Sequence, residues 1–389
     1  MTSTLASKRI PEAVLTKDPN FSFRAKLGDK QHLEVERIDK GFSKYVLSRV
    51  EVDTSWLSEK QKACVQELMQ AGRAIDAMFY RQLTPHGFEI KELLEQALQY
   101  MRTQPCIGER NLGARVLEYY NYLKINHGYY DDANEKRKFV PSFSLSEFLA
   151  EFNPRNAVSE EHARVLKDIR TRFLALSDEM YLHKGEERPP GVEFYPKSIR
   201  ATDIDMAINV AAREGRPLPQ AFVDSLGSMN TILKGKKDLD ATCGWSLSFV
   251  PYEREFASEL KVVASHMRKA ADIIEPEDGA FAIFLRARAK AIISGKKEDY
   301  DSSDVLWLKL DAPIINIVIG PIETYDDKLL AKRTSLQAFI TIQNTEATKR
   351  VQAIRELMPE FIANLPCDDR YKNRPDEPVP TIDFVDAVG

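Results

Sequence analysis

The sequence contains only four cysteines among its 389 residues, and they stand far apart. Cys64, Cys106, Cys243 and Cys367 form no Cys-x-x-Cys pair, which excludes a zinc ribbon and a thioredoxin motif. Scattered cysteines of this kind are typical of reduced, structural residues in a cytoplasmic protein, where disulfides are rare. We therefore expect four free thiols.

Long apolar runs and a surplus of basic residues are missing as well. No stretch approaches a membrane-spanning run of about 18 consecutive apolar residues, and the N-terminus has no apolar segment typical of a signal peptide. The 55 Lys and Arg residues are outnumbered by 59 Asp and Glu residues, which leaves a net charge of -4. This balance disfavours a nucleic-acid binder that relies on a basic face. We expect a cytoplasmic protein with no membrane segment and no nucleic-acid partner.

The common catalytic and metal-binding motifs are also absent. The sequence has no Gly-x-Ser-x-Gly, no Walker loop, no Gly-x-Gly-x-x-Gly and no His-Glu-x-x-His. None of its six histidines stands three or four residues from another, so no pair on one helix face can hold a metal ion. We expect no bound metal and no cofactor in this chain.

The apolar patterning predicts a helix-rich α+β protein. Ser58 and Gln61 form a capping box that opens a helix of about 25 residues. Apolar residues at steps of three and four predict a further long helix over 159–182. A β-branched run at 313–320 predicts a buried strand, with 336–344 as its partner.

The length and the changes in pattern predict four regions. Residues 1–50 form an N-terminal extension with one or more strands, of which 45–53 is the candidate. A helical region covers 51–183. A mixed region with strands covers 184–367. Residues 368–389 hold three prolines and much charge, which is typical of a tail or linker.

The segment 319–327 combines a strand end with reactive side chains. The predicted strand ends at Gly320 and Pro321, and Glu323 and Tyr325 follow two residues apart, so in an extended chain both point the same way. A carboxylate can bind an ammonium group, and a phenol can donate to a developing oxyanion. The alternative is a strand followed by an ordinary polar turn.

This segment also carries a resemblance to a known family. Residues 311–327, which read DAPIINIVIGPIETYDD, resemble the segment that distinguishes the dipeptidyl peptidase III family. Further agreement lies in the early helix (57–80), in PPGVEFYP (189–196), where Glu193 stands at the position at which the family usually has Asn, and in FVPY (249–252).

The resemblance implies a fold and an activity. Members of the family are zinc exopeptidases that release dipeptides from peptide N-termini, with two lobes around a wide cleft. Their zinc-binding helices follow the Gly-Pro-Ile-Glu-Thr-Tyr motif, and this sequence contains neither zinc motif. We therefore expect a small mixed sheet or β-barrel, like the non-zinc lobe of dipeptidyl peptidase III, and no zinc peptidase activity in the isolated chain.

The family's roles transfer to individual residues by the same resemblance. Glu323 matches the carboxylate that receives the substrate's free N-terminus, and Tyr325 matches the phenol that stabilises the tetrahedral intermediate. We take both as catalytic candidates. The resemblance adds Asp326, Tyr195 and Glu193, with Glu323, as candidates for substrate binding.

Several functions remain open at this point. The first hypothesis is a dipeptidyl-peptidase-III-like protein that binds a peptide or an amino-acid-like ligand in a cleft at Glu323 and Tyr325. The second is a metal-independent enzyme of another class, such as a proton-transfer enzyme, isomerase or cyclase. The third is the non-zinc lobe of a truncated or split peptidase, with a partner chain or lobe near the C-terminus. A scaffold module, in which Glu323 and Tyr325 are only surface turn residues, is the fourth.

Overall fold

The structure is a computed structural model, which describes residues 45, 52–103, 111–213, 220–238, 245–372 and 384–388. The chain divides into two compact units. Unit 1 comprises Met1–Ser48 and Tyr80–Glu193, and unit 2 comprises Arg49–Phe79 and Phe194–Gly389. Helix α3 (Glu59–Leu83) contributes residues to both units.

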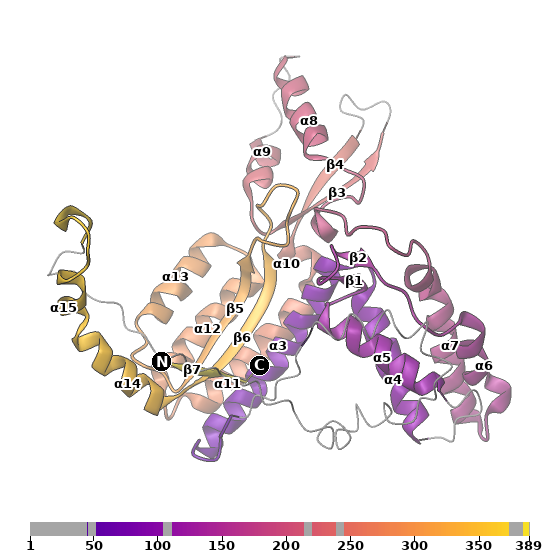
Figure 1. Ribbon diagram of the computed structural model, residues 1–389, viewed down its shortest axis with the longest axis horizontal. Coiled ribbons are helices and arrows are strands. Elements are labelled where there is room, and N and C mark those ends of the chain that lie inside the picture. The colour runs from indigo at the N-terminus through magenta and orange to yellow at the C-terminus, as the bar shows by residue number, and fades with distance from the viewer. Residues whose placement is uncertain are drawn as a thin grey trace. The chain divides into compact units, whose positions relative to one another are not determined.

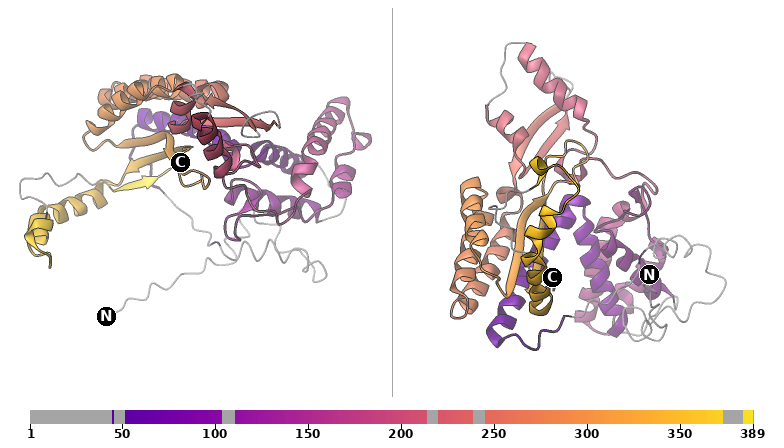
Figure 2. Two further views of the ribbon diagram at one scale, coloured as in Figure 1. Left: turned by 90° about the horizontal axis from the view of Figure 1, so that it is seen from above. Right: turned by 60° about the vertical axis from the view of Figure 1, so that its left-hand side comes forward.

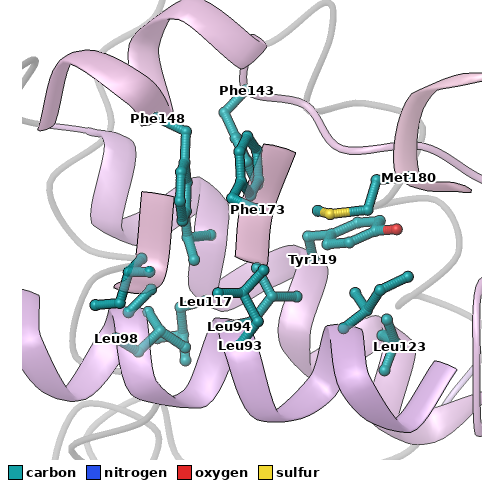
Figure 3. Close-up of a cluster of buried hydrophobic side chains, with 14 of the residues drawn as sticks. Leu93, Leu94, Leu98, Leu117, Tyr119, Leu123, Phe143, Phe148, Phe173 and Met180 are labelled. Carbon is teal, nitrogen blue, oxygen red and sulfur yellow. The ribbon is translucent and has the colours of Figure 1, made fainter. Parts of the chain in front are cut away.

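Unit 1 is a helical unit with one short β-ladder. Its elements are α4 (Gly87–Thr103), α5 (Leu112–Ile125), β1 (Tyr130–Asp131), β2 (Arg137–Lys138), α6 (Leu145–Glu151) and α7 (Glu160–Tyr181). Its core is rich in aromatic residues, and the rings of Phe148 and Phe173 stack with their centroids 3.8 Å apart (Figure 3). Helix α7 supplies Phe173 and Met180 from its apolar face, as its spacing predicts.

Unit 2 combines helices with two antiparallel sheets. Its strands are β3 (Thr231–Lys237) and β4 (Trp245–Pro251) in one sheet, and β5 (Ile315–Glu323), β6 (Ser335–Gln343) and β7 (Val385–Ala387) in the order β5-β6-β7 in the other. Its helices after α3 are α8 (Ala201–Arg213), α9 (Gln220–Gly227), α10 (Tyr252–Glu255), α11 (Ala257–Ile274), α12 (Gly279–Ser294), α13 (Lys297–Leu308), α14 (Thr345–Glu356) and α15 (Met358–Ala363).

The β5–β6 pair has one covered and one open face. Helices α11 and α12 lie on one side of these strands (Figures 1 and 2). Ile315, Ile317 and Ile319 are buried on one face of β5, whereas Val318 on the other face is 41% exposed. Gly72 of α3 lets the helix approach β6, because a methyl group there would stand 3.3 Å from Ile340 Cδ1. Buried and partly exposed side chains therefore alternate along β5, and its second face is about half exposed.

The described residues confirm the helix-rich α+β fold class and most of the predicted elements. Ser58 and Gln61 exchange both capping-box hydrogen bonds, and α3 has the expected 25 residues. The described strands form small sheets, as expected, and all of their pairs are antiparallel. Sheet-forming residues in this chain are brought together by hairpins and by a returning C-terminal strand, and neither connection requires parallel pairing.

Some elements differ from the sequence-based expectation. Helix α13 has no counterpart among the elements expected from the sequence. Within the expected tail, Val385–Ala387 pairs with β6 as β7. Of the candidate strand 45–53, residues 46–51 lie outside the described residues, as do Cys106 and Cys243. Cys64 and Cys367 are free thiols, and burial raises the pKa of Cys64 to about 12.

Among the residues that the structure describes, no helix has the length and apolar character needed to span a membrane.

Candidate functional site

The end of β5 is built around Gly320 and Pro321. Gly320 has a φ of +134°, which side-chain-bearing residues rarely adopt, and a methyl group there would lie 3.5 Å from Tyr300 Cε1. Pro321 has no N–H group, and the register of β5 against β6 shifts between Pro321 and Glu323. This irregularity ends the regular strand and leads the chain into the loop 324–334.

The loop 324–334 is held from within by the carboxylate of Asp327, which is 1% exposed. Its Oδ1 accepts hydrogen bonds from the backbone N–H groups of Leu329 and Leu330, both at 3.0 Å. Its Oδ2 accepts from those of Lys332 at 2.9 Å and Arg333 at 3.0 Å. One side chain thus satisfies four backbone donors of a segment without regular structure.

Tyr195, predicted to bind substrate, contacts this same carboxylate. Its hydroxyl donates to Asp327 Oδ2 at 2.8 Å, and Tyr195 is 4% exposed. Burial raises the pKa of the Tyr195 phenol, an effect that the neighbouring Arg333 opposes. The structure therefore places Tyr195 against the loop that carries Tyr325, and the Tyr195 hydroxyl is hydrogen-bonded to Asp327 of that loop.

Arg333 closes the loop as a fully buried cation. Its guanidinium lies 5.6 Å from the ring centroids of both Tyr195 and Phe249. Its three guanidinium nitrogens are buried and find no hydrogen-bond acceptor within the described part of the chain. The cation–π contacts with these two rings are the compensation for its charge that the structure shows.

Glu323 and Tyr325 differ from these buried residues because both are exposed. Glu323 makes no hydrogen bond or ion pair with any described residue, and Tyr325 is 55% exposed. The amide Nε2 of Gln337 donates to the Tyr325 hydroxyl oxygen at 3.0 Å. Because that oxygen already accepts a hydrogen bond, the phenolic proton remains available to donate to a ligand.

The register of β5 and β6 relates these two residues in space. Glu323 pairs with Ser335, and Gly320 pairs with Gln337. Paired residues, and residues two apart on one strand, share a face of the sheet, so Glu323, Ser335 and Gln337 belong to one face. Tyr325 reaches the same face through its bond to Gln337.

Of the other two candidates, Asp326 contacts the register partner of Glu323, whereas Glu193 belongs to unit 1. Asp326 is 6% exposed, and its Oδ2 accepts a hydrogen bond from the Ser335 hydroxyl at 2.8 Å. Glu193 is half-buried in unit 1, where burial and nearby carboxylates, Glu193 among them, raise the pKa of Tyr130. The roles of Asp326, Tyr195 and Glu193 in substrate binding stay predictions.

Sequence reasoning missed the three residues that hold the site in place: Asp327, Arg333 and Gln337. An Asp followed by a short irregular segment is a signal for local side-chain-to-backbone bonds, so Asp327 could have been found. Gln337 could not, because its contact with Tyr325 depends on the β5–β6 register.

The residues present do not fit a catalytic zinc ion. Within the described ranges, no three His, Cys, Asp or Glu side chains lie close enough together to hold a metal ion.

Comparison with solved structures defines the class of fold. The described architecture matches dipeptidyl peptidase III from Caldithrix abyssi with a TM-score of 0.62 and 21% identity, over 90% of this chain and 52% of that one. It also matches dipeptidyl peptidase III from Corallococcus sp. strain EGB with a TM-score of 0.55 and 20% identity, over 86% of this chain and 49% of that one. The chain thus spans about half the length of these structures, and it shares their fold over that half.

The sequence comparison then gives the family. Residues 234–377, which include the Glu323–Tyr325 motif, match the model of peptidase family M49, the family of dipeptidyl peptidase III. The chain is also 25% identical over 194 residues to Nudix hydrolase 3 of Arabidopsis thaliana, a match covering 48% of this chain and 24% of that protein. The resemblance read from residues 311–327 is confirmed.

Proposed function

We propose that this chain binds the free amino end of a peptide or an amino-acid-like ligand at Glu323 and Tyr325. Glu323 is the anion for the ligand's ammonium group, and the Tyr325 hydroxyl donates to a ligand oxygen. The observation that carries the proposal is the contrast within the loop: buried Asp326 and Asp327 are fully engaged, whereas Glu323 has no partner among the described residues.

The surface beside this pair favours an extended, partly apolar ligand. Val318 and Phe339 are opposite each other in the β5–β6 register and are 41% and 50% exposed. They stand two residues from Gly320 and Gln337, so they belong to the same face of the sheet as Gln337. A ligand whose amino end contacts Glu323 can therefore lay apolar side chains on Val318 and Phe339.

The openness of the pair favours binding over metal-independent catalysis. Proton transfer by a carboxylate and a phenol gains most in a site that excludes water, where charges interact strongly. Tyr325 is 55% exposed, so water reaches it freely in this half of the fold. An isomerase or cyclase is therefore the second candidate, one that requires a closed pocket around Tyr325.

We also propose that a partner chain or lobe covers a stripe on the last two helices. The stripe consists of Ile354 on α14, Leu357 between the two helices, Phe361 on α15 and Leu365 just beyond it, each about half exposed. The matched dipeptidyl peptidase III structures contain about as much chain again without counterpart in these residues. That other half is the occupant that the stripe fits.

The stripe can be tested with the complementary half of a dipeptidyl peptidase III added as a separate polypeptide. Replacing Leu357 and Phe361 with Lys should leave the melting temperature unchanged, because both side chains are exposed, yet abolish the association. Association that survives the double substitution rules out the stripe as the contact surface.

Ligand binding is tested by calorimetric titration of short apolar peptides with free amino ends. Losing one charge-assisted hydrogen bond typically costs about 1.5–3 kcal/mol, so Glu323→Gln should weaken binding by roughly tenfold or more. Tyr325→Phe should weaken it less, since it removes one neutral donor. Asp311→Asn is the matched control, because Asp311 is exposed just before β5. Equal affinity for the wild type and both site variants would refute the proposal.

A further inference from the structure

Unit 2 contains a cavity that does not include Glu323 or Tyr325. Its volume is about 800 Å³, and it lies between β5, helices α12 and α13 and the segment that leads into β3. Cavities of roughly 300–1,000 Å³ are typical of small-molecule sites. Neither Glu323 nor Tyr325 lines it, although Pro321 and Ile322 of the same motif do.

The cavity wall along β5 and α13 is largely apolar. Pro321 and Ile322 line it from the strand, and Tyr300 and Trp307 line it from the helix. The indole N–H of Trp307 already donates to Asn316 Oδ1 at 2.8 Å, so its ring offers the cavity an apolar surface. This wall suits the apolar body of a ligand.

The basic residues of the cavity are already paired. Arg288 bonds Asp304 and lies over the Tyr300 ring, 5.5 Å from its centroid, while its buried Nε finds no acceptor among the described residues. Lys297 pairs with Asp301 at 2.5 Å. An anionic ligand would have to compete with these carboxylates for both cations.

One carboxylate in the cavity has no such partner. Glu253 of α10 makes no hydrogen bond or ion pair with any residue that the structure describes. Gly295 gives it room, since a methyl group on Gly295 would lie 2.6 Å from a Glu253 carboxylate oxygen. Burial raises the pKa of Tyr300; the charge of Arg288 opposes this effect, and the charge of Glu253 adds to it.

We propose that this cavity binds an organic amine, with its ammonium group at Glu253 and its apolar body against Trp307, Pro321 and Ile322. The charge pattern selects a cation, because the cavity's two cations are neutralised and Glu253 is not. The apolar wall selects an amine with a hydrophobic body over a bare metal ion, and no three metal-ligating side chains gather among the described residues. The cavity shares Val318 with the apolar surface proposed for the peptide ligand, but its anion is Glu253 and not Glu323.

The test uses the full chain and 2-phenylethylamine as the probe, with binding followed by ligand-observed NMR because so small a ligand binds weakly. Wild type should bind 2-phenylethylamine at least tenfold more tightly than 2-phenylethanol or 3-phenylpropionate, which lack the positive charge. Glu253→Gln should remove that preference, and Tyr300→Phe should weaken it. Glu255→Gln is the matched control on the same helix, because Glu255 is exposed and pairs with Lys234.

Two results would overturn the inference. One is equal binding of the amine and the alcohol by the wild type. The other is loss of amine binding in Glu323→Gln together with its retention in Glu253→Gln, since the amine would then occupy the peptide site. If Glu323→Gln still binds the amine and Glu253→Gln does not, the cavity is supported as the amine site. This result does not depend on whether the peptide proposal is correct.

Discussion

Replacing Asp327 with Asn should destabilise unit 2 strongly, although the two side chains have nearly the same shape. The carboxylate accepts two backbone N–H groups at Oδ1, and two more together with the Tyr195 hydroxyl at Oδ2. An amide keeps one oxygen and places an NH₂ group where the other was. In the better of its two orientations, the Asn oxygen takes the place of Oδ2 and keeps those three hydrogen bonds. The NH₂ group then takes the place of Oδ1, where it faces the N–H groups of Leu329 and Leu330 and cannot accept from them.

The size of the destabilisation follows from these two N–H groups, which lose their acceptor. A buried donor left without an acceptor costs about 1–3 kcal/mol, so the change should lower the free energy of unfolding by roughly 2–6 kcal/mol. That is a large part of the 5–15 kcal/mol typical of a folded domain. Tyr195→Phe removes only one of the five bonds and should cost less, about 1–3 kcal/mol.

Urea unfolding followed by tryptophan fluorescence measures this effect. All three tryptophans, Trp56, Trp245 and Trp307, belong to unit 2, as does Asp327. Asp311→Asn is the control and should change stability by less than about 0.5 kcal/mol, since Asp311 is exposed. A change of that small size for Asp327→Asn would show that the loop is not held by this carboxylate.

Three further predictions concern the strand, the acid stability of unit 1 and zinc. Ile317→Asp should lower the melting temperature markedly or leave the chain insoluble, because Ile317 is 1% exposed. Val318→Asp, on the open face, should be tolerated. Equal melting temperatures of the two variants would contradict the assigned faces. The Arg115 guanidinium, which bonds Glu147, lowers the pKa of that carboxyl to about 2 from an ordinary value near 4.5. The stabilisation by this ion pair is therefore present above pH 4.5 and is lost as the pH falls toward 2. The free energy of unfolding should depend less on pH in this range in Glu147→Gln than in the wild type, and identical pH dependence would contradict this. Elemental analysis of the purified chain should find no stoichiometric zinc, and one tightly held zinc per chain would show a site that lies outside the described residues or forms on binding.

The sequence predicted the elements whose signals are local. The capping box at Ser58 predicts where α3 begins, and the apolar spacing of α7 predicts which of its faces is buried; the structure confirms both. The β-branched run at 313–320 predicted a strand correctly. It did not reveal that the strand has an open face, since Val318 is as apolar as its buried neighbours.

The candidate site was only partly accessible to the same reasoning. Glu323 and Tyr325 stand out beside Gly320 and Pro321 because a reactive pair follows a strand end. The roles of Tyr195 and Asp327 depend on a contact across 132 residues of sequence, which no local pattern encodes. The same holds for Gln337, whose bond to Tyr325 exists only in the observed register.

The most direct test of the peptide proposal combines one chemical change in the ligand with one in the protein. Calorimetry would compare a short apolar peptide and its N-acetylated form, against wild type and Glu323→Gln. If Glu323 holds the ammonium group, acetylation should cost the wild type about tenfold or more in affinity and cost Glu323→Gln little, so that the two changes are strongly coupled. Equal losses on acetylation in both proteins would show that the amino end is not bound at Glu323.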